Sequence, residues 1–318
     1  MYGAAATMKI TVVLCTYNRC RSLAVALESA ANLQMPPDVS WEILVVDNNS
    51  SDGTAAVVEE FRSRYPARFS YIFEPRPGKS HALNTAIRVA QGDVLAFMDD
   101  DVTVDPSWLA SLTASLQSGE WAGAGGRILP NRGFSAPPWL AAGDRQAMAP
   151  LALFDLGAEA GRLHEPPFGT NMAFRREVFV RYGGFRTDLG PQPGSQIRSE
   201  DTEFGQRLLA GGERLRYEPS AVVYHPVAEA RLQKRYFLDW WFDKGRAEVI
   251  EAGAARDFAF SVAGVPFYLL RRLMVWSVRR LIASRPSERF HCETRVSYLK
   301  GEVSQFRREA ASNKSIRD

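Results

Sequence analysis

Cysteine and long apolar segments are scarce in this chain of 318 residues. The number of cysteines is odd, and no two of them form a Cys-x-x-Cys pair: they are Cys15, Cys20 and Cys292. This argues against a disulfide framework and a zinc site, and is typical of a reducing compartment. The longest uncharged run in the last third, residues 258–270, has 13 residues and is too short to span a bilayer. No signal-peptide pattern precedes the first apolar run, so we expect a cytoplasmic protein.

Two glycine-rich nucleotide signatures are also missing. Residues 14–22 contain no glycine, whereas a sugar nucleotidyltransferase needs a glycine-rich triphosphate loop near its first strand. No Gly-x-Gly-x-x-Gly follows the first strand either, which argues against a dinucleotide-dependent oxidoreductase.

Charge is distributed unevenly along an otherwise ordinary globular composition of 46% hydrophobic and 24% charged residues. Residues 1–230 carry 21 Lys+Arg against 26 Asp+Glu, and residues 231–318 carry 18 against 10. The body is therefore acidic and the tail basic. Such a tail indicates an anionic partner, and we expect a membrane surface or another subunit rather than nucleic acid.

Apolar and β-branched runs alternate with helical patterns over the first hundred residues. The runs that predict strands are residues 10–15, 41–46, 69–73 and 94–98. The patterns that predict helices are residues 22–31, 55–65 and 81–90. Strand, loop and helix joined by short connections predict an α/β fold, with a mostly parallel sheet and right-handed crossovers.

Polar side chains follow each of these predicted strands. They are Tyr17, Asp47, Asn48, Arg76, Lys79 and the run Asp99, Asp100, Asp101. The carboxyl ends of parallel strands meet at one edge of a sheet, so these groups are expected to gather there. An aromatic ring, a side chain that can read a base, two cations and an acid cluster together predict a nucleotide-diphosphate site.

Three adjacent carboxylates repel one another unless a cation or strong donors hold them together. At the end of a buried strand the expected cation is Mg²⁺ or Mn²⁺ on a substrate diphosphate. The alternative is an acidic turn before a helix that begins at Asp105-Pro106.

Four ordered motifs resemble glycosyltransferase family 2. They are Val-Val-Leu-Cys-Thr-Tyr-Asn-Arg at residues 12–19, Val-Val-Asp-Asn-Asn-Ser-Ser-Asp-Gly-Thr at 45–54, Gly-Lys-Ser-x-Ala-Leu-Asn at 78–84 and Phe-Met-Asp-Asp-Asp at 97–101. The resemblance covers roughly residues 8–230. It implies the Rossmann-like GT-A fold and transfer of a sugar from a nucleotide donor, with inversion at the anomeric carbon.

The resemblance also implies roles for individual residues. The predicted nucleotide-sugar-binding residues are Thr16, Tyr17, Arg19, Asp47, Asn48, Arg76, Lys79, Asn84, Asp99, Asp100 and Asn171. Asp101 and His225 are the predicted ligands of Mn²⁺ or Mg²⁺, with Asp99 as a third candidate. Many family members have two acids after the second strand, but here Asn48 follows Asp47. This departure weakens any preference for a uracil base.

A second group of family-like segments lies after residue 160. Residues 168–174 resemble the segment that lines the sugar pocket, and residues 199–208 resemble the family's Glu-Asp motif at a helix start. By resemblance Asp201 is the general base, and Glu200 positions the acceptor or the loop. The alternative is a helix start enriched in acids because of the helix dipole.

The predicted organisation is a flexible leader at 1–7 and a glycosyltransferase domain at 8–230, divided into a nucleotide half (8–101) and an acceptor half (102–230). Residues 131–167 and 190–195 read as loops. An aromatic and basic amphipathic helical region follows at 231–285. Its apolar residues are Leu270, Leu273, Met274, Val278 and Leu281, with Arg271, Arg272, Arg279 and Arg280 opposite. A polar helical or flexible end at 286–318 is expected to fray from Glu302.

The sequence thus predicts a metal-dependent inverting glycosyltransferase that uses a nucleotide-sugar donor and a glycan or lipid-linked acceptor. Such an enzyme would serve polysaccharide or cell-envelope biosynthesis at the inner face of the membrane. A sugar nucleotidyltransferase and an inactive glycan-binding scaffold are the alternatives. Packing of the amphipathic tail on the protein itself, or in a homo-oligomer, is the alternative to membrane binding.

Overall fold

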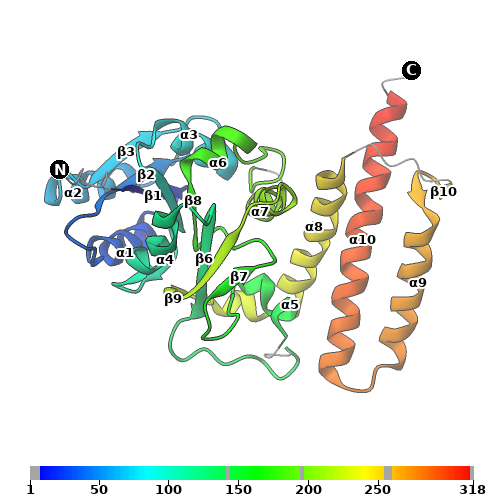
Figure 1. Cartoon of the computed structure of the whole chain (residues 1–318). Helices are drawn as coiled ribbons and strands as arrows, with labels where there is room; N and C mark the ends of the chain where they lie inside the picture. Colours follow the sequence, from blue (N-terminus) through cyan, green and yellow to red (C-terminus); the bar gives the residue numbers. More distant parts are fainter. Residues whose placement is uncertain (1–7, 141–143, 194–196, 254–259, 316–318) are drawn as a thin grey trace. The chain divides into compact units, whose positions relative to one another are not determined.

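The structure is a computed structural model that describes residues 8–140, 144–193, 197–253 and 260–315 (Figure 1). The predicted leader at 1–7 and the end of the predicted loop at 190–195 lie outside these residues. The chain forms two compact units. The first comprises residues 1–132, 152–193 and 200–226, and the second comprises residues 133–151, 194–199 and 227–318.

The first unit is built on a nine-stranded sheet, in the order β3-β2-β1-β4-β8-β6-β9-β5 with β7 beside β9. The strands are β1 Lys9–Thr16, β2 Ser40–Asp47, β3 Phe69–Phe73, β4 Val94–Asp99, β5 Thr103–Val104, β6 Gly123–Pro130, β7 Gly161–Leu163, β8 Met172–Arg175 and β9 Leu215–His225. The pairings make β3, β2, β1, β4, β6 and β9 run in one direction. The predicted α/β fold with a mostly parallel sheet is confirmed.

Helices cover both faces of this sheet (Figure 1). They are α1 Cys20–Ala31, α2 Thr54–Arg64, α3 Lys79–Val89, α4 Trp108–Ala114, the 3₁₀ turn η1 Ser115–Ser118, α6 Arg176–Tyr182 and α7 Glu200–Ala210. Buried side chains of α1, α2 and α4 form one apolar cluster, and those of α3, α6 and α7 form another. Alternate residues of β1 enter the two clusters, Val12 the first and Val13 the second. Each face of the strand is therefore buried, which is why it reads as a continuous apolar run.

The four strands predicted from apolar runs lie within β1 to β4. Strand β6 was not predicted, because its first half is Gly-Ala-Gly-Gly and lacks the β-branched residues typical of strands. Those glycines allow neighbouring segments to approach closely. A Cβ on Gly126 would lie 2.1 Å from the carbonyl oxygen of Ala221, and one on Gly123 would lie 2.3 Å from the ring of Phe174. Close packing therefore favours glycine at these positions of β6, although glycine has a low propensity for strands.

The carboxyl ends of the parallel strands meet at one edge of the sheet. Thr16 at the end of β1 pairs with Asp47 at the end of β2, and Cys15 pairs with Asp99 at the end of β4. His225 ends β9, which runs in the same direction. The topology therefore brings polar groups from distant parts of the sequence to a single edge.

The second unit contains three long helices. They are α8 Lys234–Ala252, α9 Phe267–Ile282 and α10 Pro286–Ser315, with the shorter elements α5 Arg145–Met148, η2 Ala149–Leu151, η3 Glu229–Leu232, β10 Ser261–Val262 and β11 Val265–Pro266. In the part of the chain that the structure describes, none of the helices has the length and low charge needed to cross a membrane.

Helices α8 and α10 cross with their backbones in contact at two glycines. A Cβ on Gly245 would lie 2.0 Å from the carbonyl oxygen of Tyr298. One on Gly301 would lie 2.0 Å from the carbonyl oxygen of Phe242. Each helix thus contributes one glycine, and the missing side chain lets the backbone of the other helix approach at that point.

The end of α10 does not fray from Glu302 as predicted. The helix continues to Ser315, and Glu302 and Val303 are buried. Val303 and Phe306 pack in an apolar cluster with Leu269 of α9. Two apolar residues in a polar stretch were too few to reveal this packing from the sequence.

Candidate active site

The acid cluster at the end of β4 is held by Arg19. One nitrogen of its guanidinium lies 2.9 Å from Asp100 Oδ1 and 3.0 Å from Asp101 Oδ2. The Thr16 hydroxyl donates to the other oxygen of Asp100 at 2.7 Å. Asp100 is buried, and burial raises its pKa against the opposing effect of Arg19. A cation and a hydroxyl donor therefore offset the repulsion between neighbouring carboxylates.

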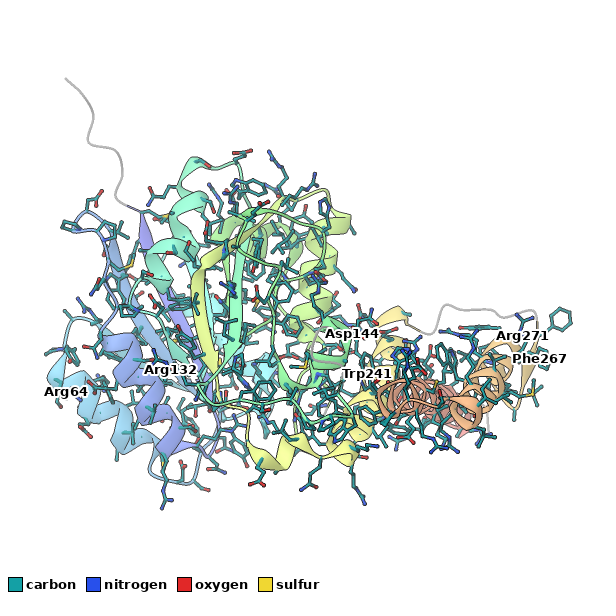
Figure 2. The ribbon with its side chains drawn as sticks, turned by 90° about the horizontal axis from the view of Figure 1, so that it is seen from below. Arg64, Arg132, Asp144, Trp241, Phe267 and Arg271 are labelled. Atoms are coloured by element: carbon teal, nitrogen blue, oxygen red, sulfur yellow. The ribbon has the colours of Figure 1, made fainter. Side chains whose placement is uncertain are left out.

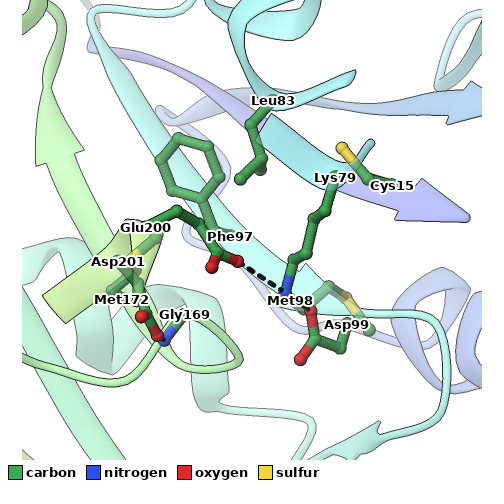
Figure 3. Close-up of a pocket in the computed structure, with 10 residues that line it drawn as sticks. All are labelled: Cys15, Lys79, Leu83, Phe97, Met98, Asp99, Gly169, Met172, Glu200 and Asp201. Atoms are coloured by element: carbon green, nitrogen blue, oxygen red, sulfur yellow. Dashed lines mark hydrogen bonds and ion pairs between the residues drawn. The ribbon is translucent and has the colours of Figure 1, made fainter. Parts of the chain in front are cut away.

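Lys79, at the start of α3, joins carboxylates from two other elements (Figure 3). Its ammonium donates to Asp99 Oδ1 of β4 at 2.7 Å and lies 3.7 Å from Glu200 Oε1 of α7. Burial by itself would lower the pKa of Lys79, but these two carboxylates raise it. Burial would likewise raise the pKa of Asp99, which Lys79 lowers. The lysine is therefore charged and ties α3, β4 and α7 together.

Glu200 is a strongly perturbed carboxyl group of this region. It is 3% exposed, and its Oε2 has no hydrogen-bond partner among the described residues. Burial raises the pKa of Glu200 to about 7, although Lys79 opposes the shift. The carboxyl therefore exchanges its proton near neutral pH.

This shift predicts a pH-dependent stability. Because the pKa of Glu200 rises from 4.5 to about 7 on folding, the folded chain binds this proton more tightly than the unfolded chain. As pH rises through this window, the wild type should lose more stability than Glu200→Gln. The unfolding free energy of the variant minus that of the wild type should therefore increase by about 3 kcal/mol as pH rises through the window. Urea denaturation of both proteins in a chelator measures this difference, and a constant difference would contradict the assignment.

Asp201 follows directly and has a different environment. Its Oδ2 accepts from the Gly169 amide at 2.6 Å, and its Oδ1 accepts from the Thr202 amide at 2.7 Å. A Cβ on residue 169 would lie 2.9 Å from Oδ2, so glycine is needed for this approach. The carboxylate is therefore held in place by main-chain donors rather than by a cation.

Asp201 lines a small pocket in the first unit (Figure 3). The polar part of the lining is Lys79, Asp99, Glu200 and Asp201, with Gly169 beside Asp201. The apolar part is Cys15, Leu83, Phe97, Met98 and Met172. One cation and three carboxylates thus meet in an otherwise apolar hollow.

His225 and Asp101 lie close to each other at the sheet edge where the parallel strands end. His225 Nε2 lies 3.8 Å from Asp101 Oδ1, and His225 is 3% exposed. In the described ranges, no group of three or more His, Cys, Asp or Glu could hold one metal ion. One carboxylate and one imidazole would leave most positions around a divalent cation for diphosphate oxygens and water. The pair therefore fits a cation that arrives with a diphosphate.

Asn48 faces into the protein. Its Oδ1 accepts from the Gly78 amide at 2.8 Å, and its Nδ2 donates to the carbonyl oxygen of Arg76 at 2.7 Å. Both ends of the amide thus hold the loop between β3 and α3. The predicted contact between Asn48 and a base stays a prediction.

Asn84 and Asn171 also bond to the framework of the fold. Asn84 accepts from the Phe185 amide and donates to the Phe185 carbonyl oxygen, both at 2.8 Å. Asn171 is fully buried, accepts from the Trp108 indole and donates to the carbonyl oxygens of Arg127 and Ala221, each at 2.8 Å. In this structure both amides join segments that are distant in sequence.

The remaining predicted residues differ in exposure. Tyr17 is 52% exposed, so its ring is available to a ligand. Asp47 is buried and accepts from the Tyr71 hydroxyl at 2.9 Å and from the Ser50 amide at 2.8 Å.

Arg76 is positioned by a residue that the sequence analysis missed. Glu74 is buried, and its carboxylate accepts from Arg76 Nε at 2.8 Å, from Nη2 at 2.9 Å and also from the Thr85 hydroxyl. The hydrogen bonds from Arg76 lower the pKa of Glu74 to about 2. The spacing Glu-Pro-Arg was the available signal, because a carboxylate two residues before an arginine can fix it in one orientation.

Comparison with known proteins identifies the chain. The profile described as glycosyl transferase family 2 matches residues 11–183. The succinoglycan biosynthesis protein ExoM of Rhizobium meliloti (strain 1021) is 30% identical over 241 residues, which is 76% of this chain and 74% of that protein. The chain belongs to glycosyl transferase family 2 and is a glycosyl-transfer enzyme, as the motifs predicted.

Two further proteins resemble the chain less closely. The glucosyl-dolichyl phosphate glucuronosyltransferase of Haloferax volcanii is 26% identical over 244 residues, which is 73% of this chain and 72% of that protein. The mannosyltransferase PcManGT of Pyrobaculum calidifontis, solved with GDP-Man and Mn²⁺, has a TM-score of 0.56 at 20% identity, over 98% of this chain and 76% of that one. At this identity the likeness concerns the fold, and it supports the predicted GT-A class.

Proposed function

We propose that the enzyme transfers a sugar from a nucleotide-diphosphate donor to a hydroxyl of a glycan or lipid-linked acceptor, with inversion and with a divalent cation. The observation that carries this proposal is the meeting of Lys79, Asp99, Glu200 and Asp201 in one pocket. A charged lysine suits a donor phosphate, and a carboxylate held by main-chain amides suits an acceptor proton.

For the cation we propose Asp101 and His225 as the protein ligands of Mn²⁺ or Mg²⁺. When bound, the ion would offset the negative charge that grows on the leaving diphosphate. PcManGT was solved with Mn²⁺, which supports a divalent ion in this fold. Asp99 bonds to Lys79 Nζ, so its direct part in metal binding is the weaker proposal.

For the donor we propose that Arg19 and Thr16 fix Asp100 in position to contact the ribose or the phosphates. The exposed ring of Tyr17 offers a stacking surface to the base, and Arg76 offers a guanidinium held by Glu74. Lys79 would exchange its bond to Asp99 for a phosphate oxygen.

For catalysis we propose that Asp201 accepts the proton of the attacking hydroxyl. An acceptor hydroxyl has a pKa far above 7, so its attack benefits from a carboxylate within hydrogen-bond reach. The Gly169 and Thr202 amides hold this carboxylate in one orientation. Glu200, with a pKa of about 7, would keep a second charge from accumulating beside it.

For the acceptor, the names of two relatives support the proposed classes. One is a succinoglycan biosynthesis protein, and the other acts on a glucosyl-dolichyl phosphate. Both a polysaccharide intermediate and a lipid-linked sugar offer the hydroxyl that the proposed reaction needs.

The proposal is tested by incubating the protein with a panel of sugar nucleotides and measuring release of the nucleoside diphosphate. We expect slow hydrolysis of one or a few donors with Mn²⁺ and none with a chelator. Release of pyrophosphate from a nucleoside triphosphate and a sugar phosphate would instead indicate a nucleotidyltransferase. Binding of donors without turnover, even with candidate acceptors, would indicate an inactive scaffold.

A further inference from the structure

Helix α9 is apolar on two opposite sides. Leu269, Leu270, Leu273 and Trp276 lie in the cluster formed with α10. The other side carries Phe267, Met274, Val278, Leu281 and Ile282, which are 57%, 62%, 52%, 68% and 75% exposed. We call these five residues the α9 outer face. The sequence analysis had merged the two sides into one apolar face, which is wrong because Leu270 and Leu273 are packed while Met274, Val278 and Leu281 are exposed.

The outer face is continuous along the helix. Phe267, Met274, Val278 and Leu281 are separated by seven, four and three residues, which places them on one side. Figure 2 labels Phe267 and Arg271 on this helix. The short hairpin before α9 adds Phe260 and Val262, which are 80% and 57% exposed. A row of large exposed apolar side chains of this kind marks an interaction surface.

The charged residues of helix α9 are all positive. Helix α9 contains four arginines, Arg271, Arg272, Arg279 and Arg280, and no lysine, aspartate or glutamate. Arg285 follows the helix and lies 3.6 Å from Glu288. Arg271 lies four residues after Phe267 and is itself exposed, so it stands within the apolar row and not opposite it as predicted. The partner of the face must therefore accept both apolar side chains and cations.

We propose that the α9 outer face docks on the surface of a membrane that contains anionic lipids. A bilayer interface takes up apolar side chains below the headgroups, while arginines remain at the level of the phosphates. Helix α9 has 16 residues and a length of about 24 Å, so it suits an orientation in the plane of the membrane. The helix would lie on the bilayer and not cross it.

A second copy of the chain is a poorer occupant of the same face. Pairing two outer faces would bring the α9 arginines of one copy against those of the other, with no acid on α9 to offset them. Anionic lipid supplies that missing negative charge. The inference does not depend on the donor, the base or the metal proposed above.

The test is sedimentation of the full chain with vesicles of phosphatidylcholine, with and without about 30% phosphatidylglycerol. We expect binding to the anionic vesicles, release by salt and little binding to the neutral ones. Arg271→Gln with Arg272→Gln should weaken binding by about 10- to 30-fold, because each arginine near an anionic surface adds to the attraction. Val278→Gln with Leu281→Gln should weaken it by about 10-fold or more, because apolar burial is lost.

Matched variants separate these effects from a general loss of charge or apolar surface. Arg307→Gln with Arg308→Gln removes two exposed arginines of α10, and Val25→Gln with Val180→Gln removes two exposed valines of the first unit. Both controls should bind vesicles nearly as well as wild type. Equal binding by all four double variants would overturn the proposal. So would a dimer in solution, without vesicle binding, that the outer-face variants dissociate, since this would assign the face to a second copy.

Discussion

Replacing Asp201 with asparagine should lower kcat by about 10²- to 10⁴-fold, the usual effect of removing a positioned general base. The amide has nearly the same shape but cannot accept the proton of the acceptor. One of the two main-chain donors, Gly169 or Thr202, would lose its acceptor, so a small loss of stability is expected as well. Donor and metal binding should be nearly unchanged, because Asp201 is not part of the Asp101–His225 pair. Steady-state transfer kinetics and donor titration measure the two effects separately.

Glu203→Gln is the matched control for this variant. It changes a carboxylate to an amide on the same helix, but Glu203 pairs with Arg207 at 2.6 Å rather than lining the pocket. Its kcat should stay close to wild type. If Asp201→Asn transfers sugar at nearly the wild-type rate, Asp201 is not the base and Glu200 becomes the candidate. If it folds but loses donor binding, the Glu-Asp segment lies on the donor side of the site.

Asp101→Ala should abolish the part of nucleotide binding that depends on the cation. A nucleoside diphosphate with Mn²⁺ should stabilise the wild type by about 3 kcal/mol when its concentration is a hundred times its Kd, and much less in a chelator. The variant removes one of two proposed protein ligands, so the two conditions should give the same small shift. Arg19 keeps its contact with Asp100 at 2.9 Å, so the local fold should survive. Thermal unfolding with and without Mn²⁺ measures the difference.

Asp38→Ala removes an exposed acid and should keep the full Mn²⁺ effect. A wild type that the nucleotide stabilises equally in chelator and in Mn²⁺ would contradict the metal assignment. An Asp101→Ala variant that keeps the Mn²⁺ effect would move the cation to other residues of the acid cluster.

The layout of residues 8–101 was predictable because the central strands β1 and β4 are buried on both faces. Such strands are continuous apolar runs, and in a parallel sheet their ends must meet at one edge. Strand β6 was not predictable, since close approach to Ala221 and Phe174 selected glycines that a strand pattern disfavours. Backbone contacts between distant segments leave no periodic trace in a sequence.

The charged residues of the candidate site lie close together, as expected from the sequence, while the roles of the charged residues and of the amides stay predictions. Arg19, Lys79 and the acid cluster lie together, because opposite charges at strand ends attract wherever the fold brings them close. An asparagine side chain has both a donor and an acceptor, so it can hydrogen-bond to main-chain groups as readily as to a ligand. Asn171 in a family-like motif therefore looked like a sugar contact, whereas its amide in this structure bonds to Trp108, Arg127 and Ala221.

The two glycine contacts between α8 and α10 also restrict how these helices can move. A slide of one helix along the other would carry a neighbouring side chain toward a carbonyl oxygen, because a Cβ at Gly245 or Gly301 would lie only 2.0 Å from one. An apolar helix pair without such contacts can exchange one set of ridges for another, whereas the two glycine contacts disfavour that exchange in this pair. We therefore expect α8 and α10 to keep this register and to move together as one body.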